Sequence, residues 1–567
     1  METAKEITAW YKELEDGEFK PLFKQMDEDF DVWEMTPSPA NISAYEVDVR
    51  NKTKEHGSEI EVVSNELRKN CDNIHSILSK ADLQIMVKMA EAEGEDKRNE
   101  VGELERLFYF LLEQGDLNLR KMVLPTLLEQ TNWCALVRGY RAARILNYKG
   151  SDDNIIANYT SLDPRWLVFE ADEKGLFKVG YKTFKNREAI EREWDVKIPN
   201  TAWFKPWDKT GKVVEVIDYW KRLKPGVYGN KVVCEGVELK SDTYKIRSMP
   251  ISIVPVATRP PIATTDGSKL RNYGQSIFAT ARNIHAVRNR FATIMANHAN
   301  LKANQPLINY KSDIGKSIPP DAMFNVPGSV IELTLKENEL KESPLQEMSQ
   351  TEGNFMAWLS GQVEDTLLPP FRIENPAASG TRYALAAEAG NIIFNPQLRS
   401  LNYSYEDICK LIEEQLIDGG VGGDKIKKIK VQSYLKKEYT EITIKPVDLK
   451  KNHIIKVETT ARNPWEQMDT AQIAQMLKGL GLPDEWLWEN ILKVRDPKLI
   501  KDLVALEVYD NSPTGAMERI VDALIRLRND KTGALSLIAE MDRAEQEAAM
   551  GQGGQQPPPA SPPPTGV

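Results

Sequence analysis

The sequence predicts a multidomain α+β protein, and three observations lead to this prediction. The chain has 567 residues, more than a single domain of roughly 150 residues contains. Apolar residues at helical spacing dominate residues 1–150, and the following stretch to about Val256 carries short β-branched and aromatic runs. Helical spacing returns from Asn463 to about Met550. Helices and strands therefore fall in successive segments of one long chain.

Composition and charge exclude several classes of protein. Charged residues make up 28% and apolar residues 41% of the chain, which is typical of globular proteins with buried cores. No apolar run reaches about 18 residues, and the N-terminus is acidic, so neither a membrane span nor a secretory signal is predicted. The 74 basic and 84 acidic residues give a net charge of -10, which argues against a protein that coats nucleic acid with its whole surface.

The strand-rich segment is divided by turn signals. Lys224-Pro225-Gly226 and Tyr228-Gly229-Asn230 are both predicted turns, and Arg187 to Trp194 is predicted to form a helix. The predicted strands are Trp166 to Phe169, Leu176 to Tyr181, Val213 to Tyr219, Lys231 to Val237 and Ile251 to Val256.

A long basic helix is predicted from Ser268 to Ala303. Its apolar residues form one stripe about 120° wide when successive residues lie about 100° apart. No acidic residue occurs from Gly267 through Ser312, in a chain that is acidic overall. The simplest interpretation of these charges is a solvated basic face. The stripe consists of Ile277, Ile284, Val287, Phe291, Ile294 and Leu301, and the charges are Lys269, Arg271, Arg282, Arg288, Arg290, Lys302 and Lys311.

A small β insert and a second helix follow. Pro306 to Tyr310 and Ser329 to Leu333 are short strand patterns within an insert from Gln305 to Pro344. Helical spacing resumes from Gln346 to Leu368 and stops at Pro369-Pro370. The two predicted helices therefore flank the insert.

A loop of small and polar residues, Pro369 to Arg382, leads into a third long helix. This helix extends to about Ile417 and should bend at Asn395-Pro396. Residues 463–550 are expected to form a separate helical domain, and residues 551–567 a disordered tail rich in Pro, Gly and Gln. Three further strands are expected to complete the strand-rich unit: Ile426 to Tyr434, Glu441 to Pro446 and Ile454 to Val457.

The chain carries no recognisable catalytic or metal-binding motif. Gly315-Lys316-Ser317 resembles the end of a phosphate loop, but the glycine required five positions earlier is Tyr310. His285 and His298 lie about 140° apart on one predicted helix, so they cannot bind one ion together. The four cysteines are far apart and lack CxxC spacing. We therefore expect no catalytic residue, no metal, no cofactor, and neither ATPase nor nuclease activity.

The order of these segments resembles that of bacteriophage portal proteins, the head-to-tail connectors of phage particles. Three stretches support the resemblance: Asn132 to Gly139, Leu162 to Trp166, and Tyr273 to Phe278, which is predicted to open the basic helix. The resemblance covers residues 50–545 in outline. It implies a portal-like fold with an α/β wing, a two-helix stem, a small β-containing clip and a helical crown.

The resemblance implies a place for each segment except the ends, for which the family pattern gives no role. These ends are an extended N-terminal arm at residues 1–50 and the tail at 551–567. The wing would be residues 51–267, the stem helices 268–303 and 346–368, the clip 304–345, the tunnel loop 369–382, the bent wing helix with closing strands 383–462, and the crown 463–550.

The resemblance also gives candidate site residues. An ordinary connector between helices remains the alternative for the tunnel loop, and its arginines would then pair with nearby acids. Candidates for contact with DNA in the channel are Arg271, Arg282, Arg288, Arg290, Arg372 and Arg382. The tunnel loop includes Pro370, Asn375, Ala377, Ser379 and Gly380, and candidates for packing between subunits are Ile277, Ile284, Phe291 and Leu301.

The implied function is a ring-shaped channel, usually of twelve subunits, at a unique vertex of the virion. The terminase would package viral double-stranded DNA through this ring, which assembles in the host cytoplasm, joins the capsid to the tail and later conducts ejection. The implied partners are further copies of the chain, DNA bound non-specifically, the terminase large subunit, capsid and scaffolding proteins, and tail adaptor proteins, with no membrane. Two other classes stay open: a subunit of a nucleic-acid-processing enzyme, and a ring or adaptor protein without a DNA channel.

Overall fold

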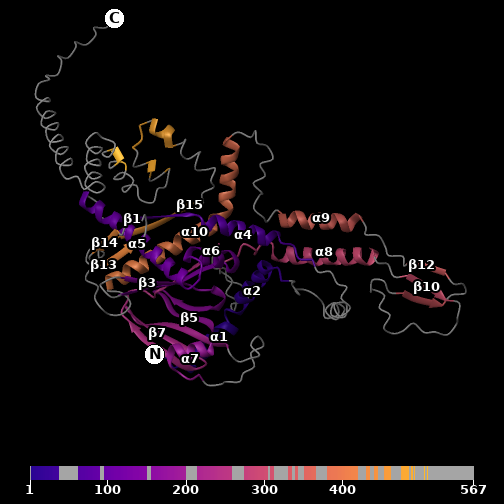
Figure 1. Ribbon diagram of the computed structural model, residues 1–567, viewed down its shortest axis with the longest axis horizontal. Helices are drawn as coiled ribbons and strands as arrows, with labels where there is room; N and C mark the ends of the chain where they lie inside the picture. Colours follow the sequence, from indigo (N-terminus) through magenta and orange to yellow (C-terminus); the bar gives the residue numbers. More distant parts are fainter. Residues whose placement is uncertain are drawn as a thin grey trace, which may run out of the picture. The chain divides into compact units, whose positions relative to one another are not determined.

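Figure 1 shows the elements of the chain in a computed structural model. The chain divides into two units, Met1–Gln467 and Met468–Val567. The described part of the first unit mixes helices with several small sheets, so the chain is an α+β protein. The described residues are 2–36, 62–89, 95–149, 155–198, 213–257, 274–303, 307–311, 330–334, 339–342, 350–364, 380–418, 429–433, 440–444, 453–460 and short stretches between 474 and 508.

An antiparallel sheet of five strands has the order β4-β5-β6-β7-β8. The strand patterns predicted between Trp166 and Val237 contribute to it. The turn predicted at Tyr228-Gly229-Asn230 is wrong, because Gly229 pairs with both Lys221 and Thr243 inside a strand. The strands are β4 (Leu167–Asp172), β5 (Gly175–Asn186), β6 (Val213–Lys224), β7 (Val227–Cys234) and β8 (Val237–Tyr244), and the predicted helix α7 (Arg187–Trp194) follows β5.

Two N-terminal helices pack on this sheet: α1 (Ala4–Asp16) and α2 (Lys20–Glu34). Thr3 begins α1 with a capping box, which satisfies backbone N–H groups at the helix start. Ile7 and Phe23 are buried in one cluster with Val168 and Val233 of the sheet. The prediction of an extended arm at residues 1–50 is therefore wrong for residues 2–36, because their apolar faces complete the core over the sheet.

A second sheet has three strands, with β2 (Tyr140–Lys149) between β3 (Ile155–Ser161) and β9 (Ile251–Pro255). Helix α5 (Glu95–Lys121) packs on β3, and α10 (Gly380–Asp418) packs on β2 and β9. The core between them contains Phe108, Ile145 and Ile408, all fully buried. Helix α6 (Leu127–Arg138) leads directly into β2.

The last strands of the first unit do not complete the five-stranded sheet, contrary to the prediction. β15 (His453–Thr460) pairs instead with β1 (Asp82–Met89), in a segment that reads as helical from the sequence. β13 (Ile429–Ser433) and β14 (Thr440–Ile444) form their own antiparallel pair and contact α5. Strands from both ends of the unit thus pack around α5 and α10.

Two helices with a small sheet between them in sequence follow β9. They are α8 (Arg282–Ala303) and α9 (Gln350–Glu364), which contact each other and lie side by side in Figure 1. The sheet has the order β11-β10-β12, with β10 (Leu307–Lys311) parallel to β11 (Val330–Thr334) and antiparallel to β12 (Glu339–Glu342). The helix, strand-containing insert and second helix of the prediction are thus present.

Helices α8 and α10 begin at other residues than predicted, and α10 contains the predicted bend. The basic helix begins at Arg282, so the prediction of a start at Ser268 is wrong for residues 274–281, which form an extended piece and a turn. Helix α10 begins at Gly380, so the loop predicted to reach Arg382 is shorter. Pro396 lies inside α10, which changes direction along its length in Figure 1, because proline cannot complete the helical hydrogen bonds.

The second unit begins near the predicted start of the helical domain at Asn463. Residues 474–479 are helical, whereas most of the predicted domain and the whole tail at 551–567 lie outside the described residues. Among the helices that the structure describes, none is both long and apolar enough to cross a membrane.

Candidate functional site

The pair formed by α8 and α9 exposes apolar side chains along its length. Val287 and Ile294 of α8 are 46% and 54% exposed, and Phe355 and Trp358 of α9 are 43% and 57% exposed. Because Val287 and Ile294 are seven residues apart, they point almost the same way from the helix. We call these four side chains the apolar face. Single exposed apolar residues are ordinary, but a row on two adjacent helices is typical of a protein contact surface.

Aromatic rings join the two helices, and Phe355 of the apolar face is one of these rings. The rings of Phe291 and Phe355 meet edge to face, with centroids 5.4 Å apart, and Phe355 stacks with Trp358 at 5.8 Å. Such pairs contribute about 0.5–1.5 kcal/mol beyond the burial of their area. Phe355 therefore contributes to the contact between the helices and is still partly exposed.

The apolar stripe predicted on the basic helix divides into two rows. Ile277 and Ile284 are partly buried against a cluster inside the subunit with Leu78, Leu136 and others, and their role as contacts between subunits stays a prediction. Phe291 is half-buried against α9. Val287 and Ile294, offset from the inner row by about 60° around the helix, form the exposed row instead. The side chain of Leu301 lies outside the described set.

Acidic side chains from the N-terminal region neutralise two arginines of α8. Arg282 Nε and Nη2 each lie 2.7 Å from a carboxylate oxygen of Asp29, which is buried. Arg288 makes a similar two-point contact with Glu66, with Nη2 2.8 Å from Oε1. The hydrogen bonds from Arg288 hold the pKa of Glu66 below its ordinary value, although burial raises it. The prediction that Arg282 and Arg288 face DNA therefore conflicts with their positions against carboxylates.

Among the other candidates for DNA contact, only the side chain of Arg290 belongs to the described part of the chain. Arg290 is exposed on α8. Arg382 lies in the first turn of α10, but its side chain is outside the described set. Arg271 and Arg372 lie outside the described residues, as do the tunnel-loop candidates Pro370, Asn375, Ala377 and Ser379, whereas Gly380 is the first residue of α10.

The base of α8 is fixed by a close approach of two backbone segments. Gly139 ends α6 with φ at 76°, a conformation that favours glycine. A Cβ atom added to Gly274 would lie 1.9 Å from the Gly139 carbonyl oxygen, so no larger residue fits without movement. The N–H of Gln275 donates to the Val256 carbonyl at 2.8 Å, and that of Ile277 to the Leu136 carbonyl at 2.9 Å. Two stretches on which the resemblance rests therefore meet at one junction.

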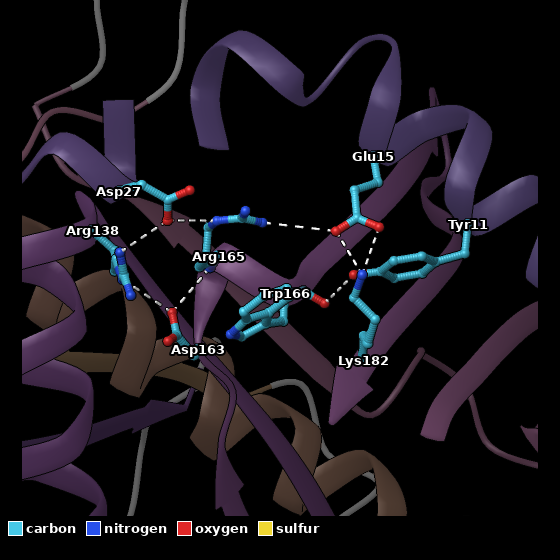
Figure 2. A network of polar contacts seen from close by, with 8 residues as sticks. All are labelled: Tyr11, Glu15, Asp27, Arg138, Asp163, Arg165, Trp166 and Lys182. Carbon is cyan, nitrogen blue, oxygen red and sulfur yellow. Dashed lines mark hydrogen bonds and ion pairs between the residues drawn. The ribbon is translucent and has the colours of Figure 1, made fainter. Parts of the chain in front are cut away.

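The third stretch, Leu162 to Trp166, joins the same junction through a charged network (Figure 2). Residues 164–166 form a short 3-10 helix, η2 (Pro164–Trp166). Arg138 Nε lies 3.3 Å from Asp163, and Arg165 Nε donates to Asp27 at 2.7 Å. The Arg138 guanidinium also donates to the Met26 carbonyl at 2.6 Å. These contacts tie α2 to the end of α6 and to η2.

The network extends to α1 through a shared carboxylate. Glu15 accepts two hydrogen bonds of 2.6 Å from Lys182 Nζ and lies 3.8 Å from Arg165 Nη1. Aromatic rings cover the cations, since Lys182 lies 5.0 Å and Arg165 4.5 Å from the Trp166 ring. The Tyr11 hydroxyl donates to the Trp166 carbonyl at 2.8 Å, as Figure 2 shows. The junction is thus a structural site whose charges are compensated internally.

Arg141 sits beneath this junction with neutral partners. It is fully buried and donates to the Asn132 side chain at 2.6 Å and to Ser400 Oγ at 3.0 Å. Burial lowers its pKa to about 9. It also donates to the Gln397 carbonyl at 3.3 Å, immediately after Pro396, so it connects α6 to the bent part of α10.

Within the described part of the chain, no group of His, Cys, Asp and Glu residues is arranged to hold a metal ion. All four cysteines are buried, and burial raises the pKa of Cys71 to about 12 and the pKa values of Cys134 and Cys409 further. A thiol with a raised pKa is a poor nucleophile at neutral pH. No protein-family model matches the chain, and no curated protein matches it.

Sequence reasoning missed the residues that support the helix pair from the N-terminal region. Asp29 and Glu66 are far from α8 in the sequence, and each lies among several other acidic residues. The acid-free segment from Gly267 to Ser312 was the available signal, because a basic helix that packs on a body must find its counter-charges elsewhere in the chain.

Proposed function

We propose that this chain is the subunit of a bacteriophage portal ring, a closed cyclic assembly whose channel conducts double-stranded DNA. The terminase large subunit, capsid and scaffolding proteins, and tail adaptor proteins are the partners proposed with it, at a unique vertex of the virion. A ring of twelve copies is the assembly expected for this class.

The apolar face of α8 and α9 is the observation that carries the proposal. Each exposed side chain of the face can remove apolar area from water only if another surface covers it, which is favourable by about 25 cal/mol per Å². In a cyclic assembly each subunit presents one surface to the neighbour on one side and a different surface to the other. An apolar row on a pair of adjacent helices suits such a contact between copies.

The order of elements supports the same assignment. Sheets and long helices are followed by α8, a small three-stranded sheet, α9 and the bent α10. In the proposal α8 and α9 are the stem, the sheet β11-β10-β12 is the clip, and α10 is the helix that returns through the wing. The segment before Gly380 is then the proposed tunnel loop.

The charges of α8 are compatible with a channel through which DNA slides. Each phosphate that a protein neutralises releases counterions and adds affinity, so a conduit works best with few strong contacts. Arg282 and Arg288 are already matched by Asp29 and Glu66. Arg290, which is exposed on α8, stays a candidate for transient contact with DNA, together with Arg271, Arg372 and Arg382.

Native mass spectrometry and electron microscopy of the purified protein test the proposal. We expect a closed ring with an axial channel wide enough for duplex DNA. Val287→Asp and Ile294→Asp together should weaken assembly without unfolding the subunit, because both side chains are already exposed. Asn283→Asp, on the same exposed side of α8, is the matched control and should assemble normally. A wild-type chain that stays monomeric at micromolar concentration would contradict the proposal.

An activity assay separates this proposal from a nucleic-acid-processing enzyme. We expect no hydrolysis of ATP or DNA by the purified ring with magnesium or manganese. Turnover that co-purifies with the protein and disappears on substitution of one carboxylate would favour the enzyme class instead.

A further inference from the structure

Helix α8 is held by two kinds of contact that differ in chemistry. At its base, Phe278 and Ala281 are almost fully buried, and the Ile277 backbone is bonded to Leu136. These contacts are apolar or made by the backbone. Along the first turns of the helix itself, by contrast, many of the contacts to the N-terminal region are ionic or polar.

The polar contacts come from α2 and from the residues that lead into α4 (Glu66–Ser79). Asp29 holds Arg282, as described above. Ser64 Oγ lies 2.9 Å from His285 Nε2, and the Ser64 N–H donates to Asn289 Oδ1 at 3.2 Å.

The segment that contains Ser64 continues along α8 in the direction opposite to that of the helix. The Val62 N–H donates to Thr293 Oγ1 at 3.1 Å, whereas Glu66 binds Arg288. Residues 62–66 therefore run antiparallel to α8 over about two turns. We call Asp29, Val62, Ser64 and Glu66 the clamp.

We propose that the clamp is a charge-controlled latch that fixes the direction of α8, and that its release lets the α8–α9 pair pivot at the turn 277–281. The base keeps an apolar hold when a clamp carboxylate is neutralised, because Phe278 and Ala281 are buried in one apolar cluster with Leu136. The hydrogen bonds from Arg282 to Asp29 and from Arg288 to Glu66 are charge-assisted, and such hydrogen bonds are stronger than neutral ones. Neutralising one carboxylate therefore weakens the hold on the helix more than it weakens the base.

The latch concerns the subunit itself and does not depend on the proposed ring. If the chain forms a ring, the same latch sets the angle of each helix pair within it. The apolar face would then move with α8, since Val287 and Ile294 lie on the held part of the helix or just beyond it.

Hydrogen exchange measured by mass spectrometry on the full chain tests the latch. Glu66→Gln and Asp29→Asn should each speed exchange of the α8 amides between Arg282 and Thr293 roughly tenfold or more, the effect expected from losing a charge-assisted bond. Exchange in α5 and in the five-stranded sheet should stay at the wild-type rate. Glu193→Gln is the matched control, because Glu193 pairs with Lys185 on the surface at 3.7 Å.

A swapped pair, Glu66→Arg with Arg288→Glu, should restore slow exchange if the charges themselves hold the helix. If Asp29→Asn does not fold, Glu66→Gln and the swapped pair suffice, since Glu66 is the more exposed carboxylate. Unchanged exchange in α8 would overturn the latch. Faster exchange throughout the first unit would also overturn it, because the clamp would then be an ordinary part of the global fold.

Discussion

The junction at the base of α8 and the α8–α9 pair above it distribute their side chains in opposite ways. In the junction, charged side chains are enclosed: Arg138 is 7% exposed, yet it contacts a carbonyl, a carboxylate and aromatic rings. On the helix pair, large apolar side chains such as Trp358 are exposed. The junction pairs its arginines with carboxylates and carbonyls of the same subunit, whereas the helix pair leaves large apolar side chains exposed.

This difference separates residues that maintain the fold from exposed residues that the proposed assembly would cover. Buried charges are tolerated only where their partners are fixed, so the junction must be rigid. An exposed apolar row costs nothing structurally in the subunit but favours association. Substitutions in the two regions should therefore affect different measurements, stability in the first and assembly in the second.

The largest effect is expected for Gly274→Ala at the junction. The added methyl would meet the Gly139 carbonyl oxygen and the Val256 nitrogen, both backbone atoms that cannot rotate away. The extended piece before α8 would have to move, at a cost of roughly 3 kcal/mol or more. A large fall in the urea midpoint is the expected measurement.

The same substitution in the helix pair is the control. A Cβ on Gly361 of α9 meets nothing within 4 Å, and alanine is favoured over glycine inside a helix by about 1 kcal/mol. Gly361→Ala should therefore leave the urea midpoint unchanged or raise it. Equal losses in both variants would remove the distinction between the two regions.

Ile284 and Ile294 allow the comparison within one helix. Ile284→Asp would place a charge against the buried cluster of Leu78 and Leu136 and should lower the stability of the subunit by about 3 kcal/mol. Ile294→Asp adds the same charge at an exposed position and should leave the melting temperature nearly unchanged while weakening assembly. Thermal unfolding and native mass spectrometry on both variants measure the two effects. A fall in stability with Ile294→Asp as large as with Ile284→Asp would contradict the assignment of inner and outer rows.

Local patterns in the sequence predicted elements whose signals are local. Strands β4 to β7 of the five-stranded sheet and helix α7 were predicted because each carries its own periodicity and lies near turn residues, whereas β8 was not predicted. The insert between two helices was found for the same reason. Strand β2 was not, because its residues are buried on both sides and show no alternation.

Contacts between distant segments could not be predicted in this way. β1 pairs with β15 near the other end of the first unit, and neither sequence indicates its partner. Residues 274–278 have helical spacing, but backbone bonds to Leu136 and Val256 hold them outside the helix. The candidate arginines show the same limit, since no pattern in α8 indicates that Asp29 and Glu66 lie against it.

A smaller effect on stability is expected at Arg138, where the comparison concerns geometry as well as charge. Arg138→Met removes the bond to the Met26 carbonyl and the pairing with Asp163, and should cost roughly 2 kcal/mol. Arg138→Lys keeps the charge but not the planar group that stacks on Phe30, so it should be only partly destabilising. Urea midpoints of both variants test this order. Lysine performing no better than methionine would show that charge contributes little there.

The smallest effect is expected from the pH dependence of the clamp at His285. Burial, with the nearby Arg288, lowers the pKa of His285 below its ordinary value of 6.5, while Ser64 and Glu66 raise it less. The unfolded chain therefore takes up a proton first as the pH falls. The contribution of neutral His285 is complete above about pH 6.5 and is lost as the pH decreases from there toward the pKa in the folded protein.

His285→Gln should flatten this part of the stability curve, measured as the urea midpoint from about pH 8 to about pH 3. Glu66 provides an internal comparison, because its pKa is held below the ordinary 4.5 by its bond to Arg288. Its contribution is present above pH 4.5 and is lost only as the pH falls further. Glu66→Gln should therefore change the slope below that value and His285→Gln the slope above it. If His285→Gln keeps the wild-type slope between about pH 6.5 and about pH 5, protonation of this histidine does not weaken the clamp, and the contact with Ser64 tolerates a charged ring.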